Sequence, residues 1–339
     1  MNTNTLTKPA RSNGLDLLKL ICAFFVIIIH VMSAEAPNGL HYQWIFITRA
    51  AVPIFFMITG WFYCSTVAKN REKKQIFKIA KLLIICMLLY FPWEIIYNLM
   101  IGSFSDFLNC FTTPSEYINF LIFNRVSGSA GHLWYLGSLL YTLIAAYVCR
   151  SFIKNQKIRT LLIITAAIGL LAVHLVFDEI LHVRNMYTRN WLMVGIPLFL
   201  LGVLLFKYRN RIQKLSMPLL IVGFAASIIA GWFEVSVAGQ HDLYTTTVFI
   251  AILLFIIFNK INIKDNFFSA AGRKHSLNIY IIHNVLIKIY LMIMASLGLA
   301  GMVTYFMPLI IFAASLVISI IFENIKGKVI AFSKSKKAS

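Results

Sequence analysis

The chain has 339 residues, of which 60% are hydrophobic and only 13% are charged, and its mean hydropathy is +0.80. Charged residues make up about a quarter of a typical soluble domain, so this much apolar surface cannot be buried inside a water-soluble chain of this length. The net charge of +19 does not indicate nucleic-acid binding, because the basic residues fall in alternate loops between apolar segments. We therefore expect membrane lipid as the surrounding medium and no nucleic-acid partner.

Ten apolar segments follow one another along the chain with only short gaps. An α-helix needs about 20 residues to cross the hydrocarbon core of a bilayer, and backbone polar groups cannot remain unpaired in lipid. The pattern predicts an all-α, polytopic integral membrane bundle of about ten transmembrane helices. The expected spans, of which 190–206 and 245–260 are short, lie near residues 15–34, 43–63, 77–100, 133–153, 158–177, 190–206, 217–234, 245–260, 276–298 and 304–322.

The loop charges predict how these helices are oriented. Basic residues cluster before the first span and in every second loop, whereas the intervening loops hold only Arg125, Arg184 and Arg189. Since Lys and Arg are enriched on the cytoplasmic side, both termini are expected in the cytoplasm. No small-residue cleavage site follows the first apolar run, so we interpret it as a retained helix. The expected organisation is a cytoplasmic segment (1–14), one membrane domain (15–322) and a basic cytoplasmic tail (323–339) in a multi-pass protein of a bacterial plasma membrane.

The first span carries ionisable residues that are costly in a bilayer and therefore indicate function. Asp16 and Lys19 lie near its start, and His30 lies near its end among apolar residues. Lys19 and His30 are eleven positions apart, which is about three helical turns and roughly 16 Å along one face. Lys19 can instead extend to the cytoplasmic headgroups, and His30 can be a buried histidine satisfied by a neighbouring helix. On the functional interpretation, His30 is a general base, because an imidazole titrates near neutral pH.

Further polar residues are expected near the depth of His30. Arg49 lies in the outer half of the second span, and Glu94 of the third span is a candidate partner for it, although such a pair could be purely structural. His132 and Trp134 begin the fourth span, where an interfacial aromatic belt is the alternative explanation. Arg189 is one of the few other cations expected near that face.

The ninth span and the start of the third span add two further patterns. Ser276, Tyr280 and His283 are spaced i, i+4 and i+7, so they share one helix face; simple helix pairing is the alternative. Lys78 and Lys81 lie one turn apart at the cytoplasmic start of the third helix. They either orient the helix or form a phosphate clamp. The five cysteines show no metal-binding spacing, and we expect no metal.

Together these segments resemble the acyltransferase family 3 membrane proteins. GLDLLKLICAFFVIIIH, with Lys19 and His30, is similar to that family's first-helix signature of a basic residue, ten others and histidine, although lysine replaces the more usual arginine. RAAVPIFFMITG, which contains Arg49, is similar to its second-helix motif. Lys78 and Lys81 occupy the place of a paired-arginine motif, and HLWYL and SLNIYIIH resemble later signatures. The resemblance covers nearly the whole chain.

The resemblance implies transfer of an acyl group, most simply acetyl, from cytoplasmic acyl-CoA to a hydroxyl of an exported or cell-surface acceptor such as a saccharide. It implies that acyl-CoA is a co-substrate and that no cofactor is held tightly. The coenzyme phosphates are expected at Lys19, Lys78 and Lys81. His30 would be the base, and Arg49 and His132 would stabilise the oxyanion or orient His30. The polar core is expected to contain Asp16, Glu94, Trp134, Arg189, Tyr280 and His283.

A second resemblance leaves a different function open. The chain is also similar to the membrane half of VanT-type serine racemases, in which this fold precedes a soluble racemase domain and is associated with L-serine uptake. A fused or associated soluble domain after Ser339 would fit that alternative. No lysine in a pyridoxal-phosphate context is present in this sequence.

Overall fold

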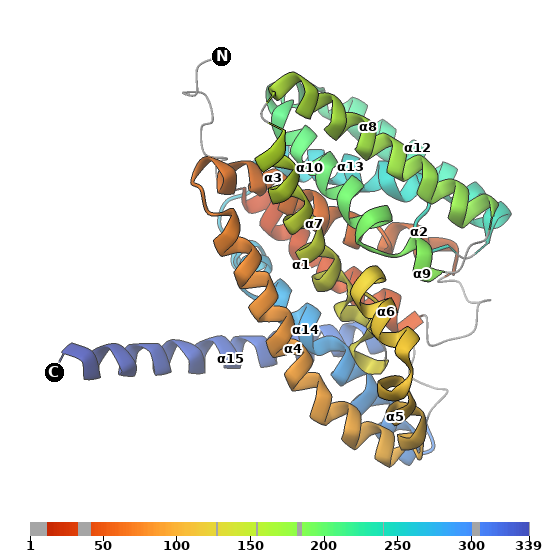
Figure 1. Cartoon of the computed structure of the whole chain (residues 1–339), viewed down its shortest axis with the longest axis vertical. Coiled ribbons are helices and arrows are strands. Elements are labelled where there is room, and N and C mark those ends of the chain that lie inside the picture. Colours follow the sequence, from red (N-terminus) through yellow and green to blue (C-terminus); the bar gives the residue numbers. More distant parts are fainter. Residues whose placement is uncertain are drawn as a thin grey trace.

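The computed structural model describes residues 12–32, 42–126, 128–153, 155–181, 185–239, 241–299 and 306–338. These residues form helices joined by turns, with no β-strand among them. Figure 1 shows the arrangement of the helices. The α-helices are α1 (Asn13–Met32), α2 (Ile45–Thr48), α3 (Ala51–Ala68), α4 (Glu72–Met100), α5 (Phe104–Thr112), α6 (Pro114–Phe123), α7 (Trp134–Phe152), α8 (Gln156–Leu175), α9 (Asn185–Thr188), α10 (Ile196–Lys207), α11 (Arg209–Ile212), α12 (Met217–Ala238), α13 (Thr245–Lys260), α14 (Phe267–Ser296) and α15 (Met307–Ala338).

Shorter helical turns of other types complete the fold. Two are 3₁₀ helices, η2 (Tyr42–Trp44) and η3 (Gly128–Leu133). Two are π-helical, η4 (Val176–Ile180) at the end of α8 and η5 (Trp191–Gly195) before α10. π-Helical turns are rare and often occur at functional sites.

Each of the ten predicted spans corresponds to a helix. Eight helical stretches in the described part of the chain are long and apolar enough to cross a membrane. Trp191–Lys207 and Thr245–Lys260 are shorter apolar helices, and they match the two spans that the sequence marks as short. The all-α, polytopic fold is thereby confirmed. The stretch 101–132, which the sequence leaves between two spans, holds the additional short helices α5 and α6.

Helices α1 and α3 lie at the centre of the bundle, where α1 contacts α3, α13, α14 and α15, and α3 packs against α10. Glycines let these helix backbones touch. A Cβ on Gly272 of α14 would lie 1.8 Å from the carbonyl oxygen of Asp16, and a Cβ on Gly202 of α10 would lie 2.1 Å from that of Met57. Small residues at such crossings allow the close approach that stabilises helix pairs in lipid.

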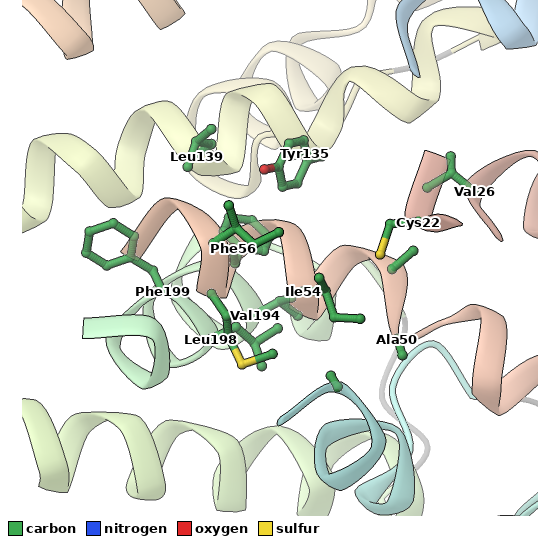
Figure 2. Packing of buried hydrophobic residues seen from close by; sticks show 14 of the residues in the cluster. Cys22, Val26, Ala50, Ile54, Phe56, Tyr135, Leu139, Val194, Leu198 and Phe199 are labelled. Carbon is green, nitrogen blue, oxygen red and sulfur yellow. The ribbon is translucent and has the colours of Figure 1, made fainter. Parts of the chain in front are cut away.

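Apolar side chains from four helices fill the space around α3. Figure 2 shows Ile54 and Phe56 of α3 among side chains of α1, α7 and α10, which include Val26, Tyr135 and Phe199. The ring of Phe56 meets that of Tyr135 at 4.8 Å between centroids. This packing fixes α3 against α7 and α10, and therefore fixes the residues at the start of α3.

The outward faces of the peripheral helices are apolar as well. Leu88 of α4, Leu161 of α8 and Phe233 of α12 are more than half exposed, as expected for side chains that face lipid. Helix α15 contacts only α14 and α1 closely, and its C-terminal part projects away from the other helices (Figure 1). The helix continues without interruption beyond Phe322, although the sequence predicts that the last span ends there and a basic tail follows.

The two ends of the bundle differ in their polar contacts. At one end, here called the basic end, Lys19 pairs with Asp16 at 2.9 Å, and Arg273 reaches the same carboxylate at 3.2 Å. Arg150 at the end of α7 pairs with Glu72 at the start of α4. His30 lies at the other end of α1, where a cavity with polar walls opens.

Candidate active site

A cavity of about 750 Å³ opens at the end of the bundle opposite the basic end. Its walls come from α1, the junction of α2 and α3, η3, α14, and the segments that precede η5 and α13. The polar side chains in its lining are those of His30, Arg49, Arg125, His132, Trp134, Arg189, His241, Asp242 and Asn284. The three residues that the sequence predicts to be catalytic, His30, Arg49 and His132, therefore line one cavity although they lie on separate elements.

Three imidazole rings meet beside this cavity. The rings of His132 and His283 are 5.0 Å apart between centroids, those of His30 and His283 are 5.1 Å apart, and those of His30 and His132 are 6.2 Å apart. His283 is fully buried and His132 nearly so, whereas His30 is half-buried. His30 is thus the member of the cluster that a reactant in the cavity can approach.

Two neighbours orient the ring of His132. The hydroxyl of Tyr90 donates to the carbonyl oxygen of Ile281 at 2.6 Å, so it is an acceptor for the Nε2–H of His132, 3.3 Å away. The side-chain amide of Asn284 approaches Nδ1 of His132 at 3.4 Å. The hydroxyl of Tyr280 donates to the backbone carbonyl of His132. His132 is consequently held at both ring nitrogens and at its backbone.

The ring of His283 is oriented by its own helix. Its Nδ1 lies 2.7 Å from the carbonyl oxygen of Tyr280, which can only accept, so Nδ1 carries the proton and Nε2 has the lone pair. Nε2 is buried and has no hydrogen-bond partner among the described residues. Tyr280 and His283 face inward together, as their i, i+3 spacing predicts, and Ser276 is buried on the same face.

Arg49 lies where the second span is interrupted. It caps α2, and α3 starts two residues later. Pro53 lacks the N–H that would bond to the carbonyl of Arg49 in a continuous helix, which favours a break at this point. The break places the guanidinium at the cavity wall, where Nη1 donates to Oδ1 of Asp242 at 2.6 Å. Both side chains are largely buried, with 10% and 13% exposed.

The predicted pairing of Arg49 with Glu94 is wrong. Glu94 is buried on α4, and its carboxylate accepts from the side chain of Asn98 at 3.3 Å. The partner of Arg49 is instead Asp242, which precedes α13. Helix spacing could not reveal this contact, because Asp242 lies outside the helices, just before α13. Glu94 is not among the residues that line the cavity.

Two arginines lie close to the carboxylate of Asp242. Burial alone favours its neutral form, but the guanidinium groups of Arg189 and Arg49 outweigh this effect and hold the pKa of the Asp242 carboxyl below its ordinary value. Nη1 of Arg189 lies 3.9 Å from Oδ1 of Asp242. Its guanidinium also stacks over the indole of Trp134, 4.9 Å from the ring centroid. Arg189 and Trp134 thus both line the cavity, as residues of the predicted polar core.

The segment before α7 is held by one buried asparagine. Asn124 has a left-handed backbone conformation, with φ of 50°, which asparagine tolerates better than most residues. Its side chain donates to the carbonyl of Trp134 at 3.1 Å and accepts from the backbone N–H of Trp191 at 2.8 Å. It thereby links the segments that carry His132 and Arg189.

The residues expected to bind the donor lie away from this cavity. Lys19 is at the basic end, held by Asp16 and placed over the ring of Phe62. Lys78 and Lys81 are exposed on α4. None of these lysines is among the described residues that line the cavity. Asp16 is likewise a residue of the basic end, where it binds Lys19 and Arg273.

Sequence reasoning missed four polar residues of the site: Tyr90, His241, Asp242 and Asn284. Asn284 directly follows His283, and Tyr90 lies one turn before Glu94, so their positions were available as signals. Asp242 gave no distinctive signal, because most of the 12 acidic residues of the chain also lie between two expected spans. None of these residues could be paired with its partner from spacing alone.

The fold and the cavity define the class of protein as a multi-pass α-helical membrane protein with a histidine- and arginine-lined cavity. The model of a family described as an acyltransferase domain, Acyl_transf_3, matches residues 12–323. The chain therefore belongs to the acyltransferase 3 family. No solved structure matches the chain.

Curated relatives of the chain carry a different name. A serine/alanine racemase of Enterococcus gallinarum is 28% identical over 284 residues, which cover 73% of this chain and 37% of that protein. Two proteins named amino-acid racemase, from Enterococcus faecalis, are 31% and 26% identical, over 42% and 62% of this chain and over 20% and 30% of their own lengths. The chain thus spans less than two fifths of the length of each of these relatives.

Proposed function

We propose that this protein transfers an acyl group, most simply acetyl, from acyl-CoA to a hydroxyl of an exported or cell-surface acceptor. The observation that carries the proposal is the convergence of His30, His132 and Arg49 on one cavity. A half-buried imidazole that faces a cavity, with a second imidazole and a guanidinium beside it, is suited to acyl transfer. Membership of an acyltransferase family supports the same chemistry.

On this mechanism His30 acts as the general base. The acceptor hydroxyl gives its proton to a ring nitrogen of His30 as its oxygen bonds to the thioester carbonyl carbon. The tetrahedral intermediate then collapses with cleavage of the carbon–sulfur bond, and the proton on His30 passes to the departing sulfur. The products are the acyl ester and free coenzyme A, and His30 returns to its neutral form. Proton transfer of this kind contributes about 10²–10⁴-fold to the rate.

The other residues stabilise charge or position His30. The guanidinium of Arg49 is held by Asp242 at 2.6 Å, so it is pre-oriented for the oxyanion that forms on the thioester carbonyl. His132 and His283 surround the ring of His30. Lys19, Lys78 and Lys81 would attract the phosphates of the donor at the basic end.

The experiment that tests this proposal compares His30→Ala with His275→Ala. His275 lies on α14, where it hydrogen-bonds Ser319 at 2.9 Å, and it is not in the cavity lining. Release of free coenzyme A from acetyl-CoA by the purified protein, with and without saccharide acceptors, measures transfer. We expect His30→Ala to lower kcat by at least about 100-fold with an unchanged melting temperature, and His275→Ala to retain most of the activity. A stable His30→Ala protein with substantial transfer would exclude His30 as the base.

A second candidate function is uptake of L-serine. It is favoured by the names of the curated relatives, which are racemases of amino acids, and by the resemblance to the membrane half of VanT-type enzymes. In that case the cavity would bind the solute and would need no base. Uptake of radiolabelled serine into proteoliposomes distinguishes the two functions on the same preparations. Transport that persists in His30→Ala, together with no release of coenzyme A by the wild type, would support uptake over acyl transfer.

A further inference from the structure

The cavity wall carries more positively charged than negatively charged side chains. Arg49 and Arg189 line the cavity beside Asp242, which is the one carboxylate among the described residues of the lining. Cations in a membrane-embedded site are costly unless an anion lies nearby. Asp242 therefore cannot balance the charge of the wall by itself.

The contacts of Asp242 show where the excess positive charge lies. Arg49 and Arg189 both approach the same carboxylate oxygen, Oδ1, at 2.6 Å and 3.9 Å. A carboxylate that paired with two guanidinium groups on equal terms would use both oxygens. Here Oδ2 of Asp242 and Nε of Arg49 are buried, and neither has a hydrogen-bond partner among the described residues. Arg49 is therefore anchored by a single strong bond, and Arg189 is bound only loosely.

Of the two arginines beside Asp242, Arg189 is the one that a ligand can reach. Its side chain is 36% exposed, compared with 10% for Arg49. The indole of Trp134 supports its guanidinium from one side, which fixes its orientation and leaves its N–H groups available for a planar anion. Because Arg189, Arg49 and His30 line the same cavity, an anion held by the arginines would share that cavity with the proposed base.

We propose that this wall binds an anionic group, a carboxylate or a phosphate, of the molecule whose hydroxyl is acylated. The inference rests on the proposed acyl transfer and narrows its acceptor to a hydroxyl compound that carries a negative charge. Asp242 holds Arg49 in place, and the anion of the acceptor bonds to Arg189. A neutral acceptor would leave the positive charge of the wall uncompensated.

Two sugars that differ in one group provide the test. Methyl β-D-glucuronoside has a carboxylate where methyl β-D-glucoside has a hydroxymethyl group, and the rest of the ring is identical. Transfer from acetyl-CoA to each sugar is measured by release of coenzyme A, and the binding of each sugar is measured separately by the shift in melting temperature without donor. Arg189→Gln removes the proposed contact, and Arg189→Lys retains the charge. Arg211→Gln, on the exposed helix α11 at the basic end, is the control for loss of one arginine.

In the wild type we expect kcat/KM for the glucuronoside to exceed that for the glucoside by about 10-fold or more. In Arg189→Gln this preference should fall below about 3-fold, and in Arg189→Lys it should recover partly. In Arg211→Gln it should stay unchanged. Added salt should weaken the preference of the wild type. Equal kcat/KM values for the two sugars in the wild type would overturn the inference and leave the acyl transfer intact.

The binding measurement separates this inference from the proposed function. If neither sugar is acylated but the glucuronoside alone stabilises the wild type and not Arg189→Gln, the anion site stands and acyl transfer does not. If neither sugar is acylated and neither stabilises the protein, both proposals are overturned.

Measurements in phosphatidylcholine and in phosphatidylglycerol vesicles identify the source of the anion. A preference for the glucuronoside that disappears in phosphatidylglycerol would mean that a lipid phosphate occupies the site, which contradicts an acceptor anion.

Discussion

Single residues of the cavity depend on partners that lie far away in the chain. Arg49 and Asp242 are 193 positions apart, and His132 is 152 positions from Asn284. His30 and Arg49 could be named as candidates from the sequence because a histidine or an arginine within an apolar segment is unusual, and His132 because its segment resembles a family motif. Their partners could not, because an aspartate between two helices, or a tyrosine or asparagine within one, does not by itself indicate what it contacts.

The Arg49–Asp242 pair gives a prediction at the scale of one residue. The pKa of Asp242 is lowered in the folded protein, so its ionised form stabilises the fold above the ordinary carboxyl pKa of about 4. This stabilisation is lost as the pH falls from that value through the lowered pKa of the folded state. Asp242→Asn should therefore lower the melting temperature by several degrees at pH 7, and its difference from the wild type should shrink steadily below about pH 4.

The control for this measurement is Asp265→Asn. Asp265 pairs with Arg273 at 3.5 Å, but its side chain is 55% exposed. An exposed pair of this kind contributes about 0–1 kcal/mol, so we expect little change at either pH. A difference between Asp242→Asn and the wild type that is the same at pH 7 and below pH 4 would show that the ionised carboxylate is not what stabilises this region.

Among the elements, the pair α1 and α14 decides how the histidines meet. The two helices run in the same direction, since Gly272 touches Asp16 near their starts and His283 lies beside His30 farther along. A separation of the helices at Gly272 would therefore be transmitted along both helices to the rings. The small-residue contact is far from the cavity but helps to set its geometry.

Gly272→Ala tests this relation. The added methyl group would lie 1.8 Å from the carbonyl oxygen of Asp16, so the helices must move apart, and overpacking of this kind costs about 1–3 kcal/mol. We expect a lower melting temperature and reduced release of coenzyme A. Gly169→Ala on α8 is the matched control, because a Cβ there meets nothing within 4 Å and alanine favours a helix by up to about 1 kcal/mol. Equal activities and melting temperatures of the two variants would contradict a role for the α1–α14 contact.

The start of α4 carries the prediction about the donor. Lys78 and Lys81 are exposed at the basic end, where clustered ammonium groups attract phosphates. The double variant Lys78→Ala/Lys81→Ala should weaken binding of acetyl-CoA and reduce its dependence on salt, without changing the affinity for an acceptor sugar. Titration calorimetry with acetyl-CoA measures the effect, and Lys73→Ala/Lys74→Ala, in the preceding turn, is the control pair. An unchanged affinity for acetyl-CoA would leave these lysines as determinants of orientation only.

The whole molecule has a polarity that the loop charges predict. The basic end is expected in the cytoplasm and the cavity is expected to open toward the other side. A single cysteine in a background without the five native cysteines tests this. Cysteine at Ser115, exposed at the start of α6, should react with an impermeant maleimide in intact cells, whereas cysteine at Lys74 should react only after permeabilisation. Comparable labelling of both positions in intact cells would overturn the orientation.

The sequence by itself determined the ten apolar helices and the residues that are unusual within them. Length, hydropathy and loop charge suffice for this, because a bilayer imposes one secondary structure and one minimum span on any chain that crosses it. The sequence also sufficed to single out His30 and Arg49 as candidates from their own spans, and His132 from a resemblance. Only the tertiary structure decided that they share a cavity, that Asp242 and not Glu94 holds Arg49, and that His283 stands behind His30. The physical reason is that helical periodicity determines only the helix face on which a residue lies. The partners of that residue depend on which glycines let two helices touch and on where a loop folds back.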